Sequence, residues 1–372
     1  MIKSQVLFKG NKMRKIVFNG KEFLRKTKRG VQRYAYELII DIDKYLEGYD
    51  AELIVPYVTE NIPKFKNIKV KVYGSWLPYK GWQYLGYQYY VWKEKALGIC
   101  LSADIAPLFY SGIVTIHDMR FNRDRNEYKT FREFLTNRYK LYTCYLSAKH
   151  AEHLITVSEY QKSEIIKYYG IDKDKISVIY SACDHLRYIN LDENKFKIKY
   201  KNILNKDFYF FLGGREKNKN VKWVIEVAKR NIKSLFVMAG PSLDGFNLED
   251  KDSSIDNIDN LIHLGFITDE EIAFFMKHCK AFIFPSTYEG FGLPPLEALY
   301  FGAKVLCSDA SCLPEIYKNY VAYFNPYDYD VDLDKLLESK VDDPKSIFDI
   351  YSFEIGAKQL FQLILKYLKT IG

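Results

Sequence analysis

The chain has 372 residues, of which 48% are hydrophobic and 27% charged, a length and balance typical of a soluble globular protein with two domains. No run of about 18 apolar residues occurs, and the first fifteen residues lack the apolar core of a signal peptide, so we expect neither a transmembrane helix nor a secretory leader. Residues 1–187 carry 32 Lys and Arg against 20 Asp and Glu, which leaves 23 against 27 for the rest. This asymmetry predicts two units with different partners.

The six cysteines show no C-x-x-C spacing, and most of them lie in apolar surroundings. We expect reduced thiols in a cytoplasmic protein, with no metal site built on them.

The first strand is predicted at residues 15–20, KIVFNG. Residues 31–46 then repeat apolar side chains at helical spacing, which places Gly30 at or beside the N-terminus of the first helix. Further strands are predicted at residues 51–58 and 68–74.

Residues 74–95 combine three of the four tryptophans with interleaved tyrosines and lysines. Trp and Tyr prefer the headgroup level of a bilayer, and lysine stems can extend beside them, so this segment is a candidate membrane-surface patch. The alternative is an aromatic helix packed inside the N-terminal domain. No nucleic-acid-binding module is recognisable, and we expect no nucleic-acid partner.

Strands are predicted at residues 104–107 and 113–118, the second ending in His117-Asp118. A strand end is the ligand-binding edge of an open parallel sheet, so this pair is a candidate site. A helix over residues 134–151 precedes HLITVSEYQ, which predicts a strand followed by a helix with Ser158 as its N-cap. A strand at residues 176–184 and a linker at 185–206 complete the first half.

The second half repeats the alternation of strand and helix. Strands are predicted at residues 208–214, 234–240, 261–266, 281–286, 304–309 and 322–326. After the first of them come Gly213, Gly214, Arg215 and Lys219, two cations beside a helix N-terminus, which suits a diphosphate. Lys217 is a competing phosphate ligand. The pattern in both halves predicts an α/β protein with two doubly wound parallel sheets.

The most informative stretch is AFIFPSTYEGFGLPPLEA, residues 281–298. A buried strand, a glycine loop and a helix beginning at Pro294-Pro295 predict an anion site at the helix N-terminus. Glu289 on the loop and Glu297, expected in the first helical turn, frame that site and can accept hydrogen bonds from the hydroxyls of a polyol.

PSTYEGFGLPPLEAL, with Gly302 and the later SCLPE, closely resembles the signature of the retaining, nucleotide-sugar-dependent glycosyltransferases with two Rossmann-like domains, the GT-B fold with an E-x7-E motif. GVQRY at Gly30, the His117-Asp118 pair and ITVSE are similar to further segments of that family. The resemblance implies an acceptor-binding domain at residues 1–187, a nucleotide-sugar-binding domain at 188–352, and a last helix at 353–372 that crosses back to the N-terminal domain, with the domains facing a cleft.

The resemblance also implies the role of each candidate residue. Catalysis would involve His117 near the donor sugar, Glu289 on the sugar hydroxyls, and Arg215 and Lys219 on the diphosphate. Glu297 would bind the ribose and Ile267 would lie at the nucleobase. The remaining contacts with donor or acceptor would come from Gly30, Asp118, Gly213, Gly214, Gly290, Phe291, Gly292 and Leu293.

The implied reaction is transfer of a hexose from a nucleotide-diphospho-sugar to a glycan or lipid-linked saccharide, in the synthesis of cell-surface polysaccharide such as capsule or O-antigen. The family needs no cofactor and no metal, and no D-x-D motif stands beside a plausible site. We expect a cytoplasmic enzyme, with peripheral attachment to the inner face of the plasma membrane if residues 74–95 contact lipid. A non-catalytic partner subunit with the same fold and a sugar-nucleotide 2-epimerase stay open as alternatives.

Overall fold

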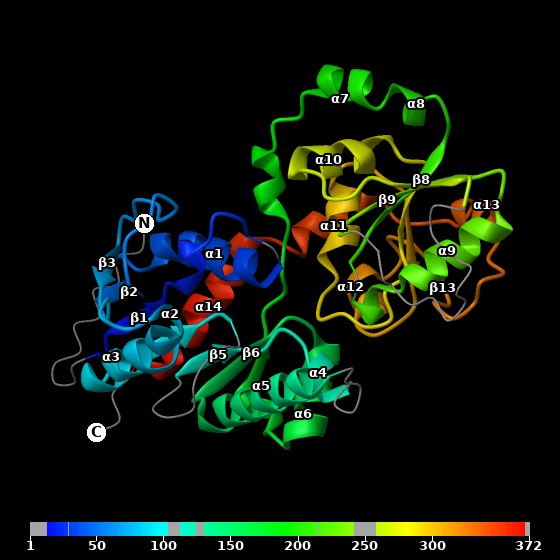
Figure 1. Cartoon of the computed structure of the whole chain (residues 1–372). Helices are drawn as coiled ribbons and strands as arrows, with labels where there is room; N and C mark the ends of the chain where they lie inside the picture. Colours follow the sequence, from blue (N-terminus) through cyan, green and yellow to red (C-terminus); the bar gives the residue numbers. More distant parts are fainter. Residues whose placement is uncertain are drawn as a thin grey trace. The chain divides into compact units, whose positions relative to one another are not determined.

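The computed structural model describes residues 13–28, 30–102, 112–123, 130–214, 216–241 and 258–368. The chain forms two compact units. Unit 1 comprises residues 1–157, 161–180 and 353–372, and unit 2 comprises residues 158–160 and 181–352. Each unit is built on its own parallel sheet (Figure 1).

Unit 1 contains a seven-stranded sheet, counted over its described residues, in the order β3-β2-β1-β4-β5-β6-β7. Its strands are β1 (Ile16–Asn19), β2 (Ala51–Val55), β3 (Ile68–Val72), β4 (Leu97–Cys100), β5 (Ile113–Thr115), β6 (His153–Thr156) and β7 (Ile176–Val178). The helices are α1 (Gly30–Ile42), α2 (Tyr79–Gly81), α3 (Tyr87–Lys93), α4 (Arg120–Arg123), α5 (Phe131–His150), α6 (Glu159–Tyr169) and α14 (Phe353–Tyr367). The first two residues of α6 belong to unit 2. Short helical turns are η1 (Lys21–Leu24), η2 (Asp43–Tyr45), the π-type η3 (Trp82–Gly86) and η4 (Lys173–Lys175).

Unit 2 contains a six-stranded sheet, again counted over described residues, in the order β10-β9-β8-β11-β12-β13. Its strands are β8 (Phe208–Leu212), β9 (Leu235–Ala239), β10 (Leu261–His263), β11 (Ala281–Phe284), β12 (Val305–Ser308) and β13 (Ala322–Phe324). The helices are α7 (Glu193–Lys199), α8 (Lys201–Leu204), α9 (Val221–Arg230), α10 (Asp269–His278), α11 (Leu293–Tyr300), α12 (Leu313–Tyr317) and α13 (Leu333–Leu337). Short turns are η5 (Asp184–Tyr188), η6 (Lys217–Lys219) and η8 (Pro344–Asp349).

All strand pairs recorded in both sheets are parallel, which confirms the predicted fold class. The central strands read as continuous apolar runs because helices cover both faces. On β8, Tyr209 and Phe211 join the cluster that includes Trp223 of α9. Phe208 and Phe210 on the opposite face contact Phe275 of α10, with ring centroids 5.8 and 5.3 Å away.

Residues 74–95 form α2, η3 and α3, so the packed-helix alternative is confirmed for the inner face of this segment. Trp82 is fully buried and clusters with Tyr87 and Tyr90 against β1 and β2. Trp76 and Trp92 are exposed by 70% and 56%, and the outer face therefore remains available to a partner.

Two sequence expectations differ from the structure in unit 1. The strand predicted at residues 104–107 lies outside the described residues, while β4, which pairs with β1 and β5, was not predicted. Its four residues include Gly98, whose position leaves an added Cβ only 3.0 Å from Val91, so close packing against α3 favours glycine where strand propensity does not.

The start of α6 has contacts that the sequence did not predict. Ser158 precedes the helix as predicted, and its hydroxyl donates to the Gly290 carbonyl at 2.7 Å. The first-turn N–H groups of Glu159 and Tyr160 donate to the Glu315 carboxylate, both at 2.8 Å. Charge-assisted hydrogen bonds from these N–H groups to a glutamate distant in sequence therefore contribute to capping the helix. The predicted linker at residues 185–206 likewise carries α7 and α8 and lies in unit 2.

Candidate active site

The candidate site lies at the carboxyl ends of β8 and β11 in unit 2. From β8 the chain proceeds to β9 on one side, and it later returns to β11 on the other side. The order of strands reverses at this pair, and such a switch point is where open α/β sheets bind ligands. The segment after β8 carries Lys219, and the loop after β11 carries Glu289.

Two asparagines connect these loops. Asn218 donates from its amide to the Tyr288 carbonyl at 2.9 Å, and its own carbonyl accepts from the Thr287 N–H at 2.8 Å. Asn220 has a left-handed backbone, φ 54°, and its amide donates to the Pro285 carbonyl at 3.1 Å. Because both neighbours of Lys219 are bonded to the opposite loop, the position of the lysine relative to that loop is well defined.

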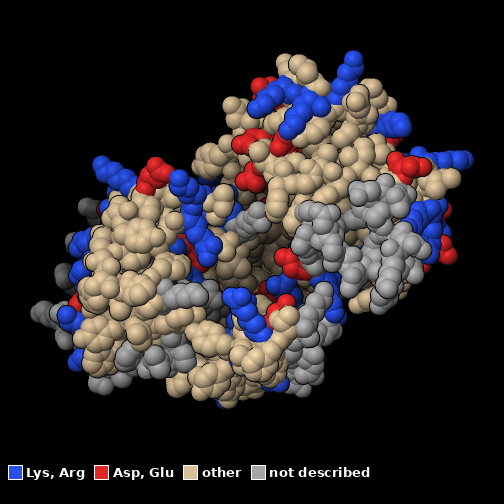
Figure 2. Space-filling view, in the orientation of Figure 1, with Lys and Arg blue, Asp and Glu red and all other residues tan. Residues whose placement is uncertain are grey.

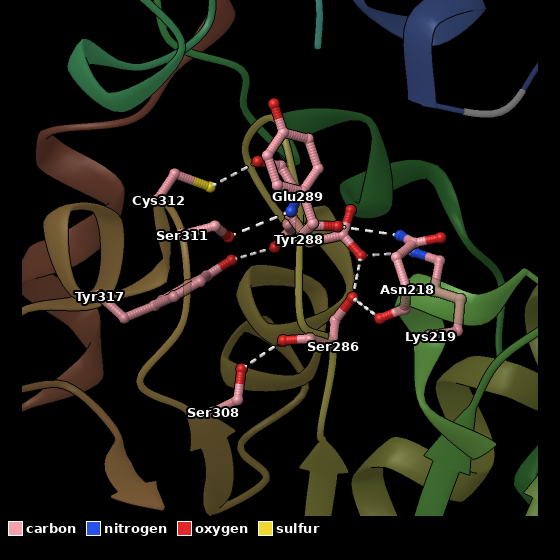
Figure 3. Close-up of polar contacts among 10 residues, drawn as sticks. Asn218, Lys219, Ser286, Tyr288, Glu289, Ser308, Ser311, Cys312 and Tyr317 are labelled. Carbon is pink, nitrogen blue, oxygen red and sulfur yellow. Dashed lines mark hydrogen bonds and ion pairs between the residues drawn. The ribbon is translucent and has the colours of Figure 1, made fainter. Parts of the chain in front are cut away.

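Glu289 and Lys219 form an ion pair, with Lys219 Nζ 2.8 Å from Oε1 of Glu289 and side-chain exposures of 24% and 14% (Figure 3). The same carboxylate oxygen lies 2.6 Å from the Ser286 hydroxyl, which is also 2.7 Å from the Asn218 carbonyl. A hydroxyl has one proton and both of these partners are acceptors, so Ser286 donates to one of them at a time.

The main chain of Glu289 is held from the other side by α12 and the turn before it. Its N–H donates to Ser311 Oγ at 3.1 Å, and the Cys312 thiol donates to its carbonyl at 3.3 Å (Figure 3). Burial raises the pKa of Cys312, and the Glu289 carboxylate adds to that effect, so the thiol stays protonated and remains a donor.

The start of α11 has fewer N–H groups than expected for an anion site. Pro294 and Pro295 have none, and the N–H of Leu296 donates to the Tyr317 hydroxyl at 3.1 Å. That hydroxyl in turn donates to the Gly292 carbonyl. Within its first turn the helix can therefore offer an anion at most the N–H of Leu293, together with its dipole.

Gly292 has φ 83°, a conformation that costs other residues free energy, and an added Cβ would lie 2.6 Å from Leu313. Phe291 beside it is buried, with its ring edge-on to Tyr351 at 5.4 Å, so any ligand contact comes from its main chain. Gly290 receives the Ser158 hydrogen bond on its carbonyl.

Glu297 does not lie in the first turn of α11 as predicted. The helix begins at Leu293, one residue before the two prolines, which places Glu297 in the second turn and partly exposed. Arg215 falls outside the described residues. Lys217, the competing cation, is exposed at the start of η6, and it is Lys219 that pairs with Glu289.

The other candidates in unit 2 lie at neighbouring strand ends. Gly213 and Gly214 follow β8, and the Gly213 N–H donates to the Ala239 carbonyl at 3.1 Å. Ile267 is partly buried and precedes Thr268, the N-cap of α10.

The candidates in unit 1 form a separate group. His117 follows β5, its Nε2 lies 2.9 Å from the Leu101 carbonyl, and its ring is edge-on to Tyr34 at 4.9 Å. Asp118 accepts from the Arg120 N–H at 3.0 Å and so supports the start of α4. Gly30 is the exposed first residue of α1.

No group of three or more His, Cys, Asp or Glu able to hold a metal ion occurs among the residues that the structure describes. Across the same residues, no helix has the length and apolar character needed to cross a membrane.

Comparison with known families identifies the chain. A family described as "Glycosyl transferases group 1" matches residues 192–347, and one described as "Glycosyltransferase Family 4" matches residues 28–187. The chain belongs to the group 1 glycosyltransferases. The activity predicted from the E-x7-E string is thereby confirmed at the level of glycosyl transfer.

Two relatives of this glycosyltransferase illustrate the range of similarity. The O-antigen chain mannosyltransferase RfbU of Salmonella typhimurium is 26% identical over 285 residues, 76% of this chain and 74% of that protein. The serotype-specific mannosyltransferase WbdA of Escherichia coli is 30% identical over 264 residues, 68% of this chain. This match spans 29% of the length of WbdA.

Solved structures share the fold. Sucrose-phosphate synthase from Thermosynechococcus elongatus has a TM-score of 0.66 at 12% identity, covering 95% of this chain and 99% of that one. HepE of Anabaena, solved with UDP and glucose, has a TM-score of 0.61 at 15% identity, covering 95% and 99%. At these identities the likeness supports the GT-B fold alone.

The residues that hold this site together in the glycosyltransferase were not predicted. Ser286, Asn218, Ser311 and Tyr317 act through main-chain carbonyls and N–H groups from other loops. The sequence position of Ser286 could have identified it as a site residue, because it follows Pro285 at the end of the strand and precedes Glu289 by three residues. The partners of Tyr317 are fixed by the tertiary fold and have no counterpart in a local pattern.

Proposed function

We propose that this glycosyltransferase moves a hexose, with retention of configuration, from a nucleotide-diphospho-sugar to a hydroxyl of a glycan or lipid-linked saccharide in cell-surface polysaccharide synthesis. The observation that carries the proposal is the Lys219–Glu289 pair at the switch point of unit 2. A cation for the diphosphate and a carboxylate for sugar hydroxyls stand side by side, as donor binding requires.

In this proposal unit 2, within residues 188–352, binds the donor and unit 1, within residues 1–187, binds the acceptor. Lys219 and Arg215 neutralise the diphosphate, and Gly214 and the loop from Gly290 to Leu293 supply N–H groups. Gly213, whose N–H donates to the Ala239 carbonyl, lets the diphosphate approach the main chain closely. Glu289 accepts from the sugar hydroxyls and Glu297 from the ribose hydroxyls, while Ile267 packs at the nucleobase. Gly30, His117 and Asp118 line the reacting side of unit 1.

During transfer the bond between the anomeric carbon and the phosphate oxygen breaks through an oxocarbenium-like state. The acceptor oxygen attacks from the same face, and its proton passes to the departing phosphate oxygen. Negative charge grows on the phosphate, where each lost contact typically costs about 2.7–4 kcal/mol of barrier. We assign no metal to this step, because the Lys and Arg carry the neutralising charge.

Mannose is the first hexose to test, because the relatives RfbU and WbdA are named as mannosyltransferases. We further propose a cytoplasmic enzyme that reaches its acceptor at the inner face of the plasma membrane. Within residues 74–95 the lipid contact would come from the exposed Trp76 and Trp92, because Trp82 is buried.

The test is thermal unfolding against UDP, GDP, dTDP, ADP and CMP, followed by donor turnover with the matching sugar nucleotide. A ligand at 100 times its Kd stabilises the protein by about 2.7 kcal/mol, enough to raise the midpoint clearly. We expect one nucleoside diphosphate to do so and the matching donor to be consumed. Binding without turnover would favour a non-catalytic subunit, and conversion of the donor to its 2-epimer would favour an epimerase; either result contradicts the proposal.

A further inference from the structure

Helix α5 has a second apolar face that the core of unit 1 does not use. Its inner side packs on the β5–β6 cluster through Ala148, with Cys144 partly buried beside it. The opposite side exposes large side chains along three turns: Phe131 by 74%, Leu135 by 52%, Tyr139 by 48% and Tyr142 by 63%. At 3.6 residues per turn these four lie within about a third of the helix circumference.

Basic side chains accompany this exposed face. The helix carries four Lys and Arg against one acid, Glu133. Arg138 lies within the same arc at this spacing, and its guanidinium stands 5.2 Å from the ring of Phe134. In Figure 2 the surface where Figure 1 draws α5 is mostly tan, with blue atoms among it. Aromatic and aliphatic side chains with flanking cations are the composition of a helix that lies in a bilayer interface.

The face continues onto the aromatic segment already described. The ring of Tyr84 in η3 lies edge-on to Tyr139 of α5, with centroids 6.1 Å apart. The outward residues of that segment are Trp76, Leu85, Tyr89 and Trp92. Unit 1 therefore carries two adjoining stretches of exposed apolar side chains, and such adjoining exposure usually marks an interaction surface.

We propose that the outer face of α5, defined by Phe131, Leu135, Tyr139 and Tyr142, docks onto an anionic lipid bilayer, with α5 lying parallel to the surface. Charge complementarity selects this occupant, because the cations of α5 suit acidic headgroups. A second copy of the chain fits less well, since a two-fold interface along α5 would bring its basic residues together. The inference rests on the proposed function in one respect: docking on a bilayer would bring the enzyme to a lipid-linked acceptor.

The experiment compares co-sedimentation of the full chain with vesicles of equal parts phosphatidylglycerol and phosphatidylcholine, and with phosphatidylcholine alone. The test variant is Leu135→Asp with Tyr142→Asp. The control is Thr136→Asp with His150→Asp, which adds the same two negative charges at exposed sites of α5 outside the apolar arc. We expect the wild type to bind the anionic vesicles and to weaken with salt, the test variant to lose at least about tenfold in partitioning, and the control to stay within about twofold.

Equal binding of the test variant and wild type would overturn the inference, as would a dimer in solution that the test variant dissociates without change in vesicle binding. The variant Trp76→Ser with Trp92→Ser measures how much residues 74–95 contribute to vesicle binding. Nucleoside diphosphate thermal shifts on every variant keep the two proposals apart. If the wild type binds nucleotide but not anionic vesicles, the docking of α5 is contradicted and the proposed transfer is not. If it binds vesicles but no nucleoside diphosphate, the proposed transfer is contradicted and the docking of α5 is not.

Discussion

At the scale of single residues, the ion pair between Lys219 and Glu289 means that the two groups proposed for donor binding neutralise each other in the ligand-free site. A donor has to replace that pair with contacts from Lys219 to phosphate and from Glu289 to sugar hydroxyls. The free energy of the pair therefore opposes binding of the nucleotide part and is regained only when the sugar is present.

Glu289→Gln separates these two effects. Without the carboxylate, sugar contacts weaken in the transition state, and we expect donor turnover to fall by about 10²–10³-fold. Lys219 loses its competing partner, so affinity for the bare nucleoside diphosphate should stay constant or rise. Calorimetry and single-turnover kinetics measure the two quantities, with Glu338→Gln on the exposed surface as control. Near-normal turnover, or a matching loss of diphosphate affinity, would contradict this account.

Ser286 positions Glu289, and its removal tests that role. Ser286→Ala deletes the hydroxyl that lies 2.6 Å from the Glu289 carboxylate and 2.7 Å from the Asn218 carbonyl, while that carbonyl keeps the Thr287 N–H. A hydrogen bond to a charged group contributes about 1.5–3 kcal/mol, so kcat should fall by roughly ten- to a hundredfold while KM changes little. Ser286→Thr keeps the hydroxyl and should recover most of the loss. An equal loss in the threonine variant would indicate a packing defect instead.

At the scale of elements, the turn before α11 depends on one glycine for two reasons, backbone conformation and space. Gly302, just after the same helix, provides a matched comparison: it shares φ 83° but has no atom within 4 Å of a built Cβ. Gly292 has the same φ, but a Cβ added there would lie 2.6 Å from the Leu313 side chain.

Alanine at each position separates the cost of the left-handed backbone from the cost of the steric clash. Gly302→Ala should cost about 1–2 kcal/mol from the left-handed backbone alone. Gly292→Ala should cost about 1–3 kcal/mol more, because Leu313 or the loop has to move, and nucleotide affinity should drop with it. Urea unfolding followed by circular dichroism measures both variants. Equal losses of unfolding free energy in the two variants would show that Leu313 moves aside at no cost.

These elements also show how far sequence reasoning reaches. Strands such as AFIF and FYFFL were predictable because burial on both faces produces unbroken apolar runs. Glu289 and Lys219 could be chosen as candidates from the sequence because each lies in a short motif that follows such a strand. By contrast, β4 contains a glycine required by packing, and the capping of α6 by Glu315 joins residues 155 positions apart. Trp82 and Trp92 belong to the same aromatic-rich segment, yet Trp82 is buried and Trp92 is exposed, which composition alone does not distinguish.

At the scale of the whole molecule, we expect acid to destabilise the two units over different pH ranges, because one buried group in each has a shifted pKa. In unit 1, burial and the positive charges of Lys366, Lys175 and Lys162 lower the pKa of His153 to about 4. In unit 2, burial raises the pKa of Glu271, but hydrogen bonds from Lys199, the Thr268 N–H and Tyr200 outweigh it and bring the pKa to about 2.

Both folded pKa values are depressed, so each group stabilises its unit above its unfolded pKa and loses that contribution as the pH falls. For His153 the loss runs from about pH 6.5 to 4, and for Glu271 from about 4.5 to 2. At pH 5 these groups predict that unit 1 has lost roughly 2 kcal/mol while unit 2 is unchanged.

Hydrogen exchange at pH 7.5 and 5, corrected for intrinsic rates, measures this difference on β6 of unit 1 and α10 of unit 2. His153→Gln should remove the pH dependence on β6. Loss of protection on α10 before β6 would contradict the assignment.

Unit 1 is discontinuous in sequence, because α14 returns to it after all of unit 2. The helix packs on α1, where Gly356 lies against Leu38, and on the following turn η2, where Phe361 stacks on Tyr45 at 5.7 Å. During synthesis the residues of unit 2 therefore leave the ribosome before the last helix of unit 1 exists. The unit that begins first is completed last, and α1 keeps an apolar face uncovered for the time needed to translate more than half of the chain. Nascent chains of this glycosyltransferase are thus exposed to chaperones through their N-terminal unit, and a truncation at the C-terminal end damages the unit that lies at the opposite end of the sequence.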